Sequence, residues 1–285
     1  MSDVPSNTIL CGDCLKAPFP WFGGKSTVAD LVWQRFGDVP NYVEPFFGSG
    51  AVLLKRPSDH QGTCETVNDL DGMVANFWRA IQHDPEQVAF YADNPVNEND
   101  LHARHIWLVN QRDTFVPRLE ADPEFFDAKI AGWWCWGVCC WIGSGFCSGH
   151  GPWQVVDGQL VRLGDKGQGV NRKRVHLGGG QGVNRKRVAI TNDGIGRTRL
   201  SGGIYDWFDA LAERLRRVRV CCGDWSRVCG PTPTVKQGVT GVFLDPPYGV
   251  QDRSDCYTVD DRVVAHDVQE WAIEWGDDPR MRIDL

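Results

Sequence analysis

Residues 244–249 of this 285-residue chain, Leu-Asp-Pro-Pro-Tyr-Gly, carry the strongest chemical signal in the sequence. They follow an apolar run, which predicts a buried strand that ends in a rigid loop. Pro246 and Pro247 have no backbone N–H, so their carbonyls and the carboxylate of Asp245 are acceptors beside the ring of Tyr248. This arrangement suits a planar substrate with an amino group. This segment contains no strong base and no nucleophile, so the nitrogen of the substrate amine would be the nucleophile. The electrophile must then come from a cofactor.

A glycine turn in residues 43–50, Val-Glu-Pro-Phe-Phe-Gly-Ser-Gly, could hold that cofactor. The pattern predicts a strand, a turn and a helix, and Gly48 and Gly50 let the backbone approach a ligand closely. A second strand is predicted to end at Asp69, about twenty residues downstream, which is the spacing of a Rossmann-like nucleoside site. Asp69 would then bind ribose hydroxyls, although it could instead cap the helix predicted over residues 70–82.

The Gly-Gly-Lys-Ser run at residues 23–26 suggests a phosphate-binding P-loop, but the spacing excludes it. The first glycine of that motif would fall at position 19, which is Phe19. Pro18 and Pro20 also cannot both lie in the central strand that a P-loop follows. Trp21 and Lys25 therefore need another explanation.

The remaining pattern alternates helices with strands. A helix is predicted over residues 26–36, capped by Ser26, with Val28, Leu31, Val32 and Phe36 on one face. Further helices are predicted over residues 204–218 and 265–275, and strands over 218–224, 240–244 and 281–285. Such alternation is typical of a doubly wound parallel α/β sheet. Asp224, at the end of one strand, would touch the cofactor or simply belong to a loop.

Composition limits the class of protein. The chain is 42% hydrophobic and 24% charged, contains no apolar run of 18 residues, and begins without the features of a signal peptide. Eleven cysteines, several of them adjacent, suit free thiols in a reducing cytoplasm. Cys11 and Cys14 form a single pair with poor zinc spacing, so we expect no metal. We expect a monomer with no membrane association.

A basic duplicated segment stands out against the net charge of −7. Residues 161–200 hold ten Lys or Arg and two Asp, and residues 167–179 are repeated at 180–192. A local basic patch on an acidic protein indicates contact with a polyanion, although a solvated loop is the alternative. The candidate DNA-binding residues in the two copies are Arg172, Lys173, Arg174, Arg185, Lys186 and Arg187.

Together these motifs resemble the Dam-type adenine-specific DNA methyltransferases, in the alpha-type order, over residues 16–80 and 200–250. In that family a Trp-x-Gly-Gly-Lys segment contacts the methionine part of S-adenosylmethionine, which explains Trp21 and Lys25. The resemblance implies that an adenine flipped out of double-stranded DNA stacks on Tyr248. Asp245 and the Pro246 carbonyl would bind its amine and direct it at the cofactor methyl group. The implied cofactor-binding residues are Trp21, Gly24, Lys25, Glu44, Phe46, Gly48, Gly50, Asp69, Asp224 and Asp245, and the implied catalytic residues are Asp245, Pro246, Pro247 and Tyr248.

The family fold implies a Rossmann-like sheet of seven mostly parallel strands. We expect a discontinuous catalytic domain, residues 1–84 and 200–285, and an inserted helical, loop-rich target-recognition region, residues 85–199. The Trp- and Cys-rich stretch near residues 131–151 would form the core of that insertion. The catalytic domain is expected to lack its last strands, being about forty to sixty residues short of a complete sheet.

Three other functions remain open from the sequence. Methylation of the cytosine exocyclic amine is the nearest, although Asp rather than Ser before Pro-Pro favours adenine by family resemblance. Methylation of a protein glutamine is the second, but those enzymes usually have Asn at the position of Asp245. A catalytically inactive, truncated DNA-binding homologue is the third.

Deleting residues 180–192, one copy of the repeat, should weaken binding to all DNA sequences similarly. Cations on phosphates release counterions, so each lost contact should lower the salt slope of binding by about one unit. Titrations of DNA at several salt concentrations measure this. An unchanged affinity and salt slope would make the segment a solvated loop.

Overall fold

The structure is a computed structural model. It describes residues 15–21, 24–62, 64–122, 124–141, 146–147, 153–157, 159–162, 203–247 and 263–285. Tyr248 and all six candidate DNA-binding residues of the repeats lie outside the described residues.

Five parallel strands form the central sheet, in the order β5-β2-β1-β6-β7. The strands are β1 (Asn41–Glu44), β2 (Cys64–Asp69), β5 (Val218–Cys222), β6 (Thr240–Phe243) and β7 (Met281–Asp284). From β1 the chain adds β2 and β5 on one side and β6 and β7 on the other. The order therefore reverses between β1 and β6, and ligands of such sheets bind outside the carboxyl ends at this reversal.

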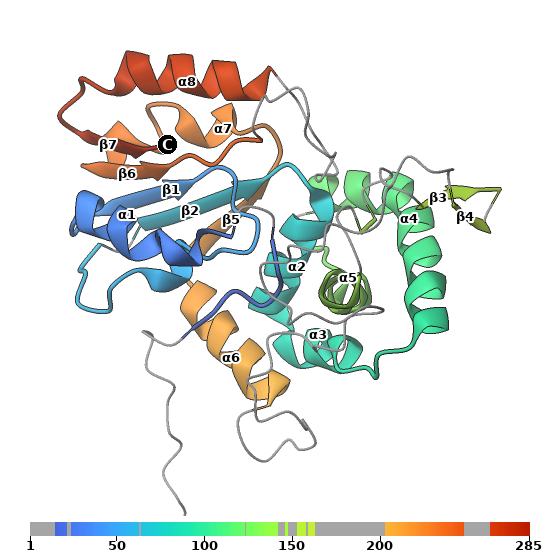
Figure 1. Cartoon of the computed structure of the whole chain (residues 1–285). Helices are drawn as coiled ribbons and strands as arrows, with labels where there is room; N and C mark the ends of the chain where they lie inside the picture. The colour runs from blue at the N-terminus through green and yellow to red at the C-terminus, as the bar shows by residue number, and fades with distance from the viewer. Residues whose placement is uncertain are drawn as a thin grey trace, which may run out of the picture.

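Both faces of the sheet are covered. Side chains alternate along β1, so Tyr42 belongs to one apolar core and Val43 to the other. The first core contains α1 (Ala29–Phe36), α2 (Gly72–His83) and α6 (Ile204–Leu215), and the second contains α7 (Ser226–Cys229) and α8 (Val264–Trp275). Figure 1 shows α7 and α8 beside β6 and β7, away from α2 and α6. The doubly wound α/β fold predicted from the sequence is confirmed.

The region between α2 and α6 is mainly helical. It contains α3 (Pro85–Ala92), α4 (Glu98–Ala121), α5 (Ala128–Cys140) and an antiparallel hairpin of β3 (Trp153–Val156) and β4 (Gln159–Arg162). Trp134 and Trp136 of α5 are fully buried in the same core as Phe77 and Phe208, so this region shares its core with the sheet. The boundary between a catalytic domain and an insertion stays a prediction.

The first helix differs from the prediction in its cap and its face. It begins at Ala29 after a 3-10 turn (Lys25–Thr27), and no side chain caps it. Val32 and Phe36 are buried as predicted, but Val28 and Leu31 are 40% and 48% exposed. Trp33 turns inward instead, because its indole N–H donates to the buried carbonyl of Val52 at 2.8 Å.

Other elements are shorter than predicted. The helix expected after the glycine turn is only a 3-10 turn (Leu53–Lys55), and β5 ends at Cys222, two residues before Asp224. The described part of the chain contributes five strands to the sheet, against the seven that the family resemblance implies. Asp71, rather than Asp69, caps α2 by accepting the Met73 N–H at 2.9 Å.

A buried carboxylate fastens β2 to two neighbouring segments. Glu65 accepts from Arg56 at 2.9 Å and from both terminal nitrogens of Arg214 at 2.7 and 2.8 Å. The two arginines also donate to the carbonyls of Val39 and Leu53. Removing the carboxylate would leave the buried Arg56 guanidinium without its ion-pair partner.

Glu65→Gln should therefore lower the free energy of unfolding by about 3 kcal/mol. Urea denaturation measures it. Glu213→Gln is the control, because the Glu213 side chain is 76% exposed and lies 3.8 Å from Arg216. Equal effects of the two substitutions would show that the Glu65 network does not stabilise the fold.

Candidate active site

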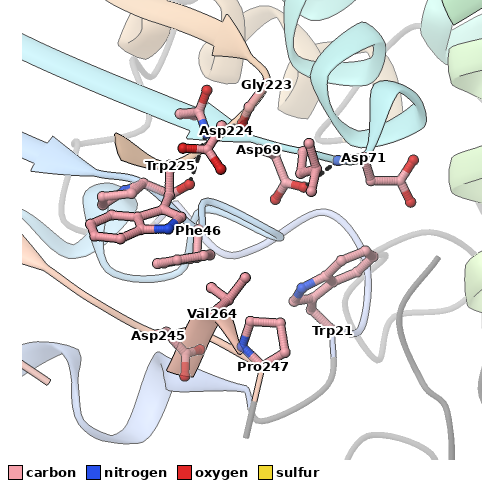
Figure 2. Close-up of a pocket in the computed structure, with 13 residues that line it drawn as sticks. Trp21, Phe46, Asp69, Asp71, Gly223, Asp224, Trp225, Asp245, Pro247 and Val264 are labelled. Carbon is pink, nitrogen blue, oxygen red and sulfur yellow. Dashed lines mark hydrogen bonds between the residues drawn. The ribbon is translucent and has the colours of Figure 1, made fainter. Parts of the chain in front are cut away.

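An open pocket lies at the carboxyl edge of the sheet, where the strand order reverses. Its space, with the open mouth included, is about 710 Å³. Figure 2 shows Phe46 and Trp225 on one side, Trp21 on another, and Asp245 and Pro247 at one end. The pocket is lined by Trp21, Pro45, Phe46, Asn68, Asp69, Leu70, Asp71, Gly223, Asp224, Trp225, Asp245, Pro247 and Val264.

Asp69 is held at the end of β2 by backbone donors. Its carboxylate accepts from the N–H of Gly48 at 2.8 Å and of Asp71 at 2.9 Å. Burial, and then the nearby charge of Asp71, raises the pKa of Asp69 to about 7, although the two N–H groups oppose the shift. The acid thus lies against the glycine turn, as the nucleoside-site spacing predicted.

The glycine turn adopts a backbone that favours glycine. Gly48 and Gly50 have φ values of 48° and 70°. A Cβ on Gly48 would lie 2.4 Å from the Trp21 ring, so the absence of a side chain lets Trp21 pack on the turn. The indole N–H of Trp78 fixes the turn from behind by donating to the Gly48 carbonyl at 2.8 Å.

Two aromatic rings form one side of the pocket. Phe46 follows β1 and Trp225 follows β5, and their rings are nearly parallel, 28° apart, with centroids 6.3 Å from one another. Asp224 is exposed beside them, and its carboxylate accepts the Ser226 N–H at 2.9 Å. Asp224 therefore makes a local turn before α7 as well as lining the pocket.

An ion pair joins the first motif to the last. Lys25 Nζ lies 2.8 Å from Asp245 Oδ1, and the two side chains are 20% and 15% exposed. They line an adjoining recess with Trp21, Gly24 and Glu44. Residues 220 positions apart in the sequence thus meet above the ends of β1 and β6.

Glu44 lines the same recess as this ion pair and is buried. It accepts the Tyr42 hydroxyl at 2.8 Å. Burial, and to a smaller extent the charge of Asp245, raises the pKa of Glu44 to about 8, against the lowering effect of the Tyr42 bond. Glu44 is therefore largely protonated at neutral pH, which limits the negative charge around Asp245.

The structure brings most of the predicted site together. Trp21, Phe46, Asp69, Asp224, Asp245 and Pro247 line the pocket, and Gly24, Lys25 and Glu44 line the adjoining recess. Gly48 and Gly50 shape the turn behind it, Pro246 is buried, and Tyr248 lies outside the described residues. Sequence reasoning missed the other residues that line the pocket, among them Asn68 and Trp225, although each of these two lies next to a predicted acid.

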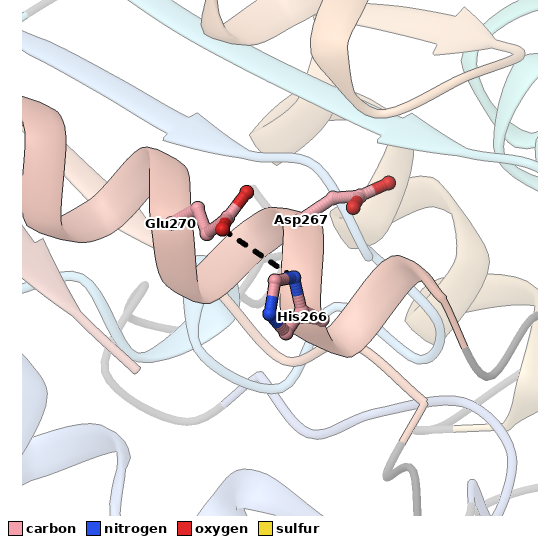
Figure 3. Close-up of side chains that lie close together, drawn as sticks. All are labelled: His266, Asp267 and Glu270. Carbon is pink, nitrogen blue, oxygen red and sulfur yellow. Dashed lines mark ion pairs between the residues drawn. The ribbon is translucent and has the colours of Figure 1, made fainter.

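The described residues also contain one group of potential metal ligands, which, unlike the pocket, is exposed on the surface of a helix. His266, Asp267 and Glu270 are exposed on α8, with ligand atoms within 4.8 Å of one another (Figure 3). His266 and Glu270 are one helical turn apart and form a 3.7 Å pair. Neighbours on a helical turn account for this cluster without a metal.

The raised pKa values predict a pH dependence of stability. The folded state holds protons on Glu44 and Asp69 that the unfolded chain releases above about pH 4, so unfolding becomes easier as pH rises from about 4 to 8. Glu44→Gln should reduce this loss by at least about 1 kcal/mol. Urea unfolding at pH 5 and 8 measures it, with the exposed Glu274→Gln as control. If the free energy of unfolding of Glu44→Gln changed with pH as it does in the wild type, the prediction that Glu44 is protonated in the folded state would be wrong.

Comparison with known proteins agrees with this geometry. Residues 21–121 match the family model described as D12 class N6 adenine-specific DNA methyltransferase. No curated protein matches the chain. The match begins at Trp21 and includes the glycine turn and Asp69, and it supports adenine rather than cytosine or a protein glutamine. Over residues 21–121 the chain is thus similar to the D12 class N6 adenine-specific DNA methyltransferases.

Proposed function

We propose that the pocket binds S-adenosylmethionine and that the chain methylates the exocyclic amine of adenine in double-stranded DNA. The observation that carries this proposal is the convergence of Asp69, Phe46 and Asp245 at the carboxyl ends of β2, β1 and β6. The family match supports adenine methylation as the reaction, and the pocket is the site where we propose that it takes place.

The residues of the pocket fit the cofactor. The nucleoside part needs a hydroxyl-binding acid and a flat apolar surface, which Asp69 and the Phe46–Trp225 pair provide. Gly48 keeps the turn compact, and the backbone there can approach a ligand closely. Trp21, Gly24 and Lys25 would hold the methionine part. When bound, the cofactor supplies an electrophilic methyl group.

The catalytic segment would act by positioning. Asp245 and the Pro246 carbonyl accept hydrogen bonds from the adenine amine, and Pro247 and Tyr248 contact the base. Lys25 fixes the orientation of the Asp245 carboxylate through their ion pair. Protonated Glu44 leaves that carboxylate with less competing negative charge. The rate enhancement would come from orientation and electrostatics rather than from a protein nucleophile.

The DNA would meet this edge of the sheet and the region between α2 and α6. We propose that this region, residues 85–199, recognises the target and that the basic repeats contact the phosphate backbone. Within the described ranges no helix is both long and apolar enough to cross a membrane. We further propose that the protein works as a monomer in the cytoplasm.

Asp245→Ala should abolish transfer of labelled methyl groups to DNA while S-adenosylmethionine affinity stays within about tenfold, since the loss is in orienting the amine. Asp284→Ala is a matched control, because Asp284 lies at the end of the neighbouring strand β7, its side chain is likewise 15% exposed, and it pairs with Arg35 at 2.7 Å. Transfer by the Asp245 variant at the rate of the wild type would remove Asp245 from catalysis. A wild-type protein without transfer or cofactor binding would contradict the proposed function itself.

A further inference from the structure

Asn68 is a buried polar residue that the proposed chemistry does not use. It is 1% exposed, lies next to Asp69 in β2 and lines the pocket. Its side-chain Nδ2 donates to the carbonyl of Pro45 at 3.1 Å and to the carbonyl of Gly223 at 2.8 Å. Asn68 therefore bridges the loops after β1 and β5, which are not neighbours in the sheet.

The chemistry of the amide fixes which way the side chain faces. Both partners are carbonyl oxygens, so only the NH₂ group, which has two N–H bonds, can satisfy both. Asn68 Oδ1 is buried and has no hydrogen-bond partner in the part of the chain that the structure describes. The contribution of the side chain thus rests on the two donated bonds.

The two residues that accept these bonds come shortly before the aromatic residues of the pocket in the sequence. Pro45 precedes Phe46, and Gly223 precedes Asp224 and Trp225. The backbone adds one tie to each loop, because Phe47 N–H donates to the Asn68 carbonyl at 2.9 Å and Gly223 N–H to the Asp69 carbonyl at 3.1 Å. The end of β2 therefore determines how Phe46 and Trp225 lie relative to one another.

We infer that Asn68 is a positioning residue that sets the relation of Phe46 to Trp225 and so the affinity for the adenosine part of the cofactor. The inference rests on the proposed function, since it concerns the same pocket. The side-chain hydrogen bonds of Asn68 reach the loops after β1 and β5 and not the loop after β6, which carries Asp245. Their loss should therefore weaken cofactor binding more than it slows methyl transfer at saturation.

Asn68→Leu tests the inference, because leucine has a similar shape but no donor and no charge. We expect the Kd of S-adenosylmethionine to rise about tenfold and that of adenosine by a similar factor, while kcat at saturating cofactor stays within about twofold. Calorimetry with each ligand and methyl-transfer kinetics measure these quantities. If the leucine variant does not fold, the same Kd and kcat measurements on Asn68→Ser test the inference.

Asn41 offers a matched control at the opposite end of the sheet. It is also fully buried, its Nδ2 also donates twice, to Pro233 O at 2.8 Å and Thr240 Oγ1 at 2.9 Å, and its Oδ1 is likewise without a partner among the described residues. Asn41→Leu should lower stability but leave both Kd values within about twofold.

Unchanged Kd values in a folded Asn68 variant would overturn the inference. So would an equal loss in the Asn41 variant, because the effect would then be general destabilisation. Failure of the wild-type protein to bind S-adenosylmethionine would instead overturn the proposed function, and this inference with it.

Discussion

The parallel pairing of β1 with both β2 and β6 is the constraint on which the site depends. In register, Val43 lies opposite Val242 of β6, and Glu44 opposite Val67 of β2. The three strands thus end at one edge, and the residues that follow them share a small volume. Glu44, Asp69 and Asp245 come from distant parts of the sequence and meet only because the strands run in the same direction.

This convergence concentrates acidic groups, and the fold compensates for them in different ways. Asp69 accepts two backbone N–H groups, Asp245 pairs with Lys25, and Glu44 keeps its proton at neutral pH. An unpaired buried carboxylate would otherwise be costly.

Aromatic packing connects the helical region to the site. Phe19 contacts Trp21 at 5.7 Å and Trp134 of α5 at 4.9 Å between ring centroids, so the ring on the glycine turn rests on a helix from residues 85–199. Stacked and edge-on aromatic pairs add to the apolar burial here. The helical region thus packs directly against the Trp21 ring that lines the pocket.

The sequence by itself determined the class of fold, the order of the motifs and six of the thirteen residues that line the pocket. It did so because glycine turns, strand-terminal acids and Asp-Pro-Pro-Tyr have local geometric requirements that can be recognised without the rest of the chain. The buried face of α1 was predicted less well, because it depends on the hydrogen bond from the Trp33 indole to the Val52 carbonyl. The helix expected after the glycine turn stops at Lys55 for a local reason that the prediction overlooked, because Pro57 has no N–H to donate to the Leu53 carbonyl, which accepts from the Arg56 N–H instead. Only the tertiary structure decided that Lys25 pairs with Asp245, that Glu44 holds a proton, and that Asn68 joins the loops carrying Phe46 and Trp225. Each of these depends on burial and on contacts between segments far apart in the chain, which local sequence patterns do not specify.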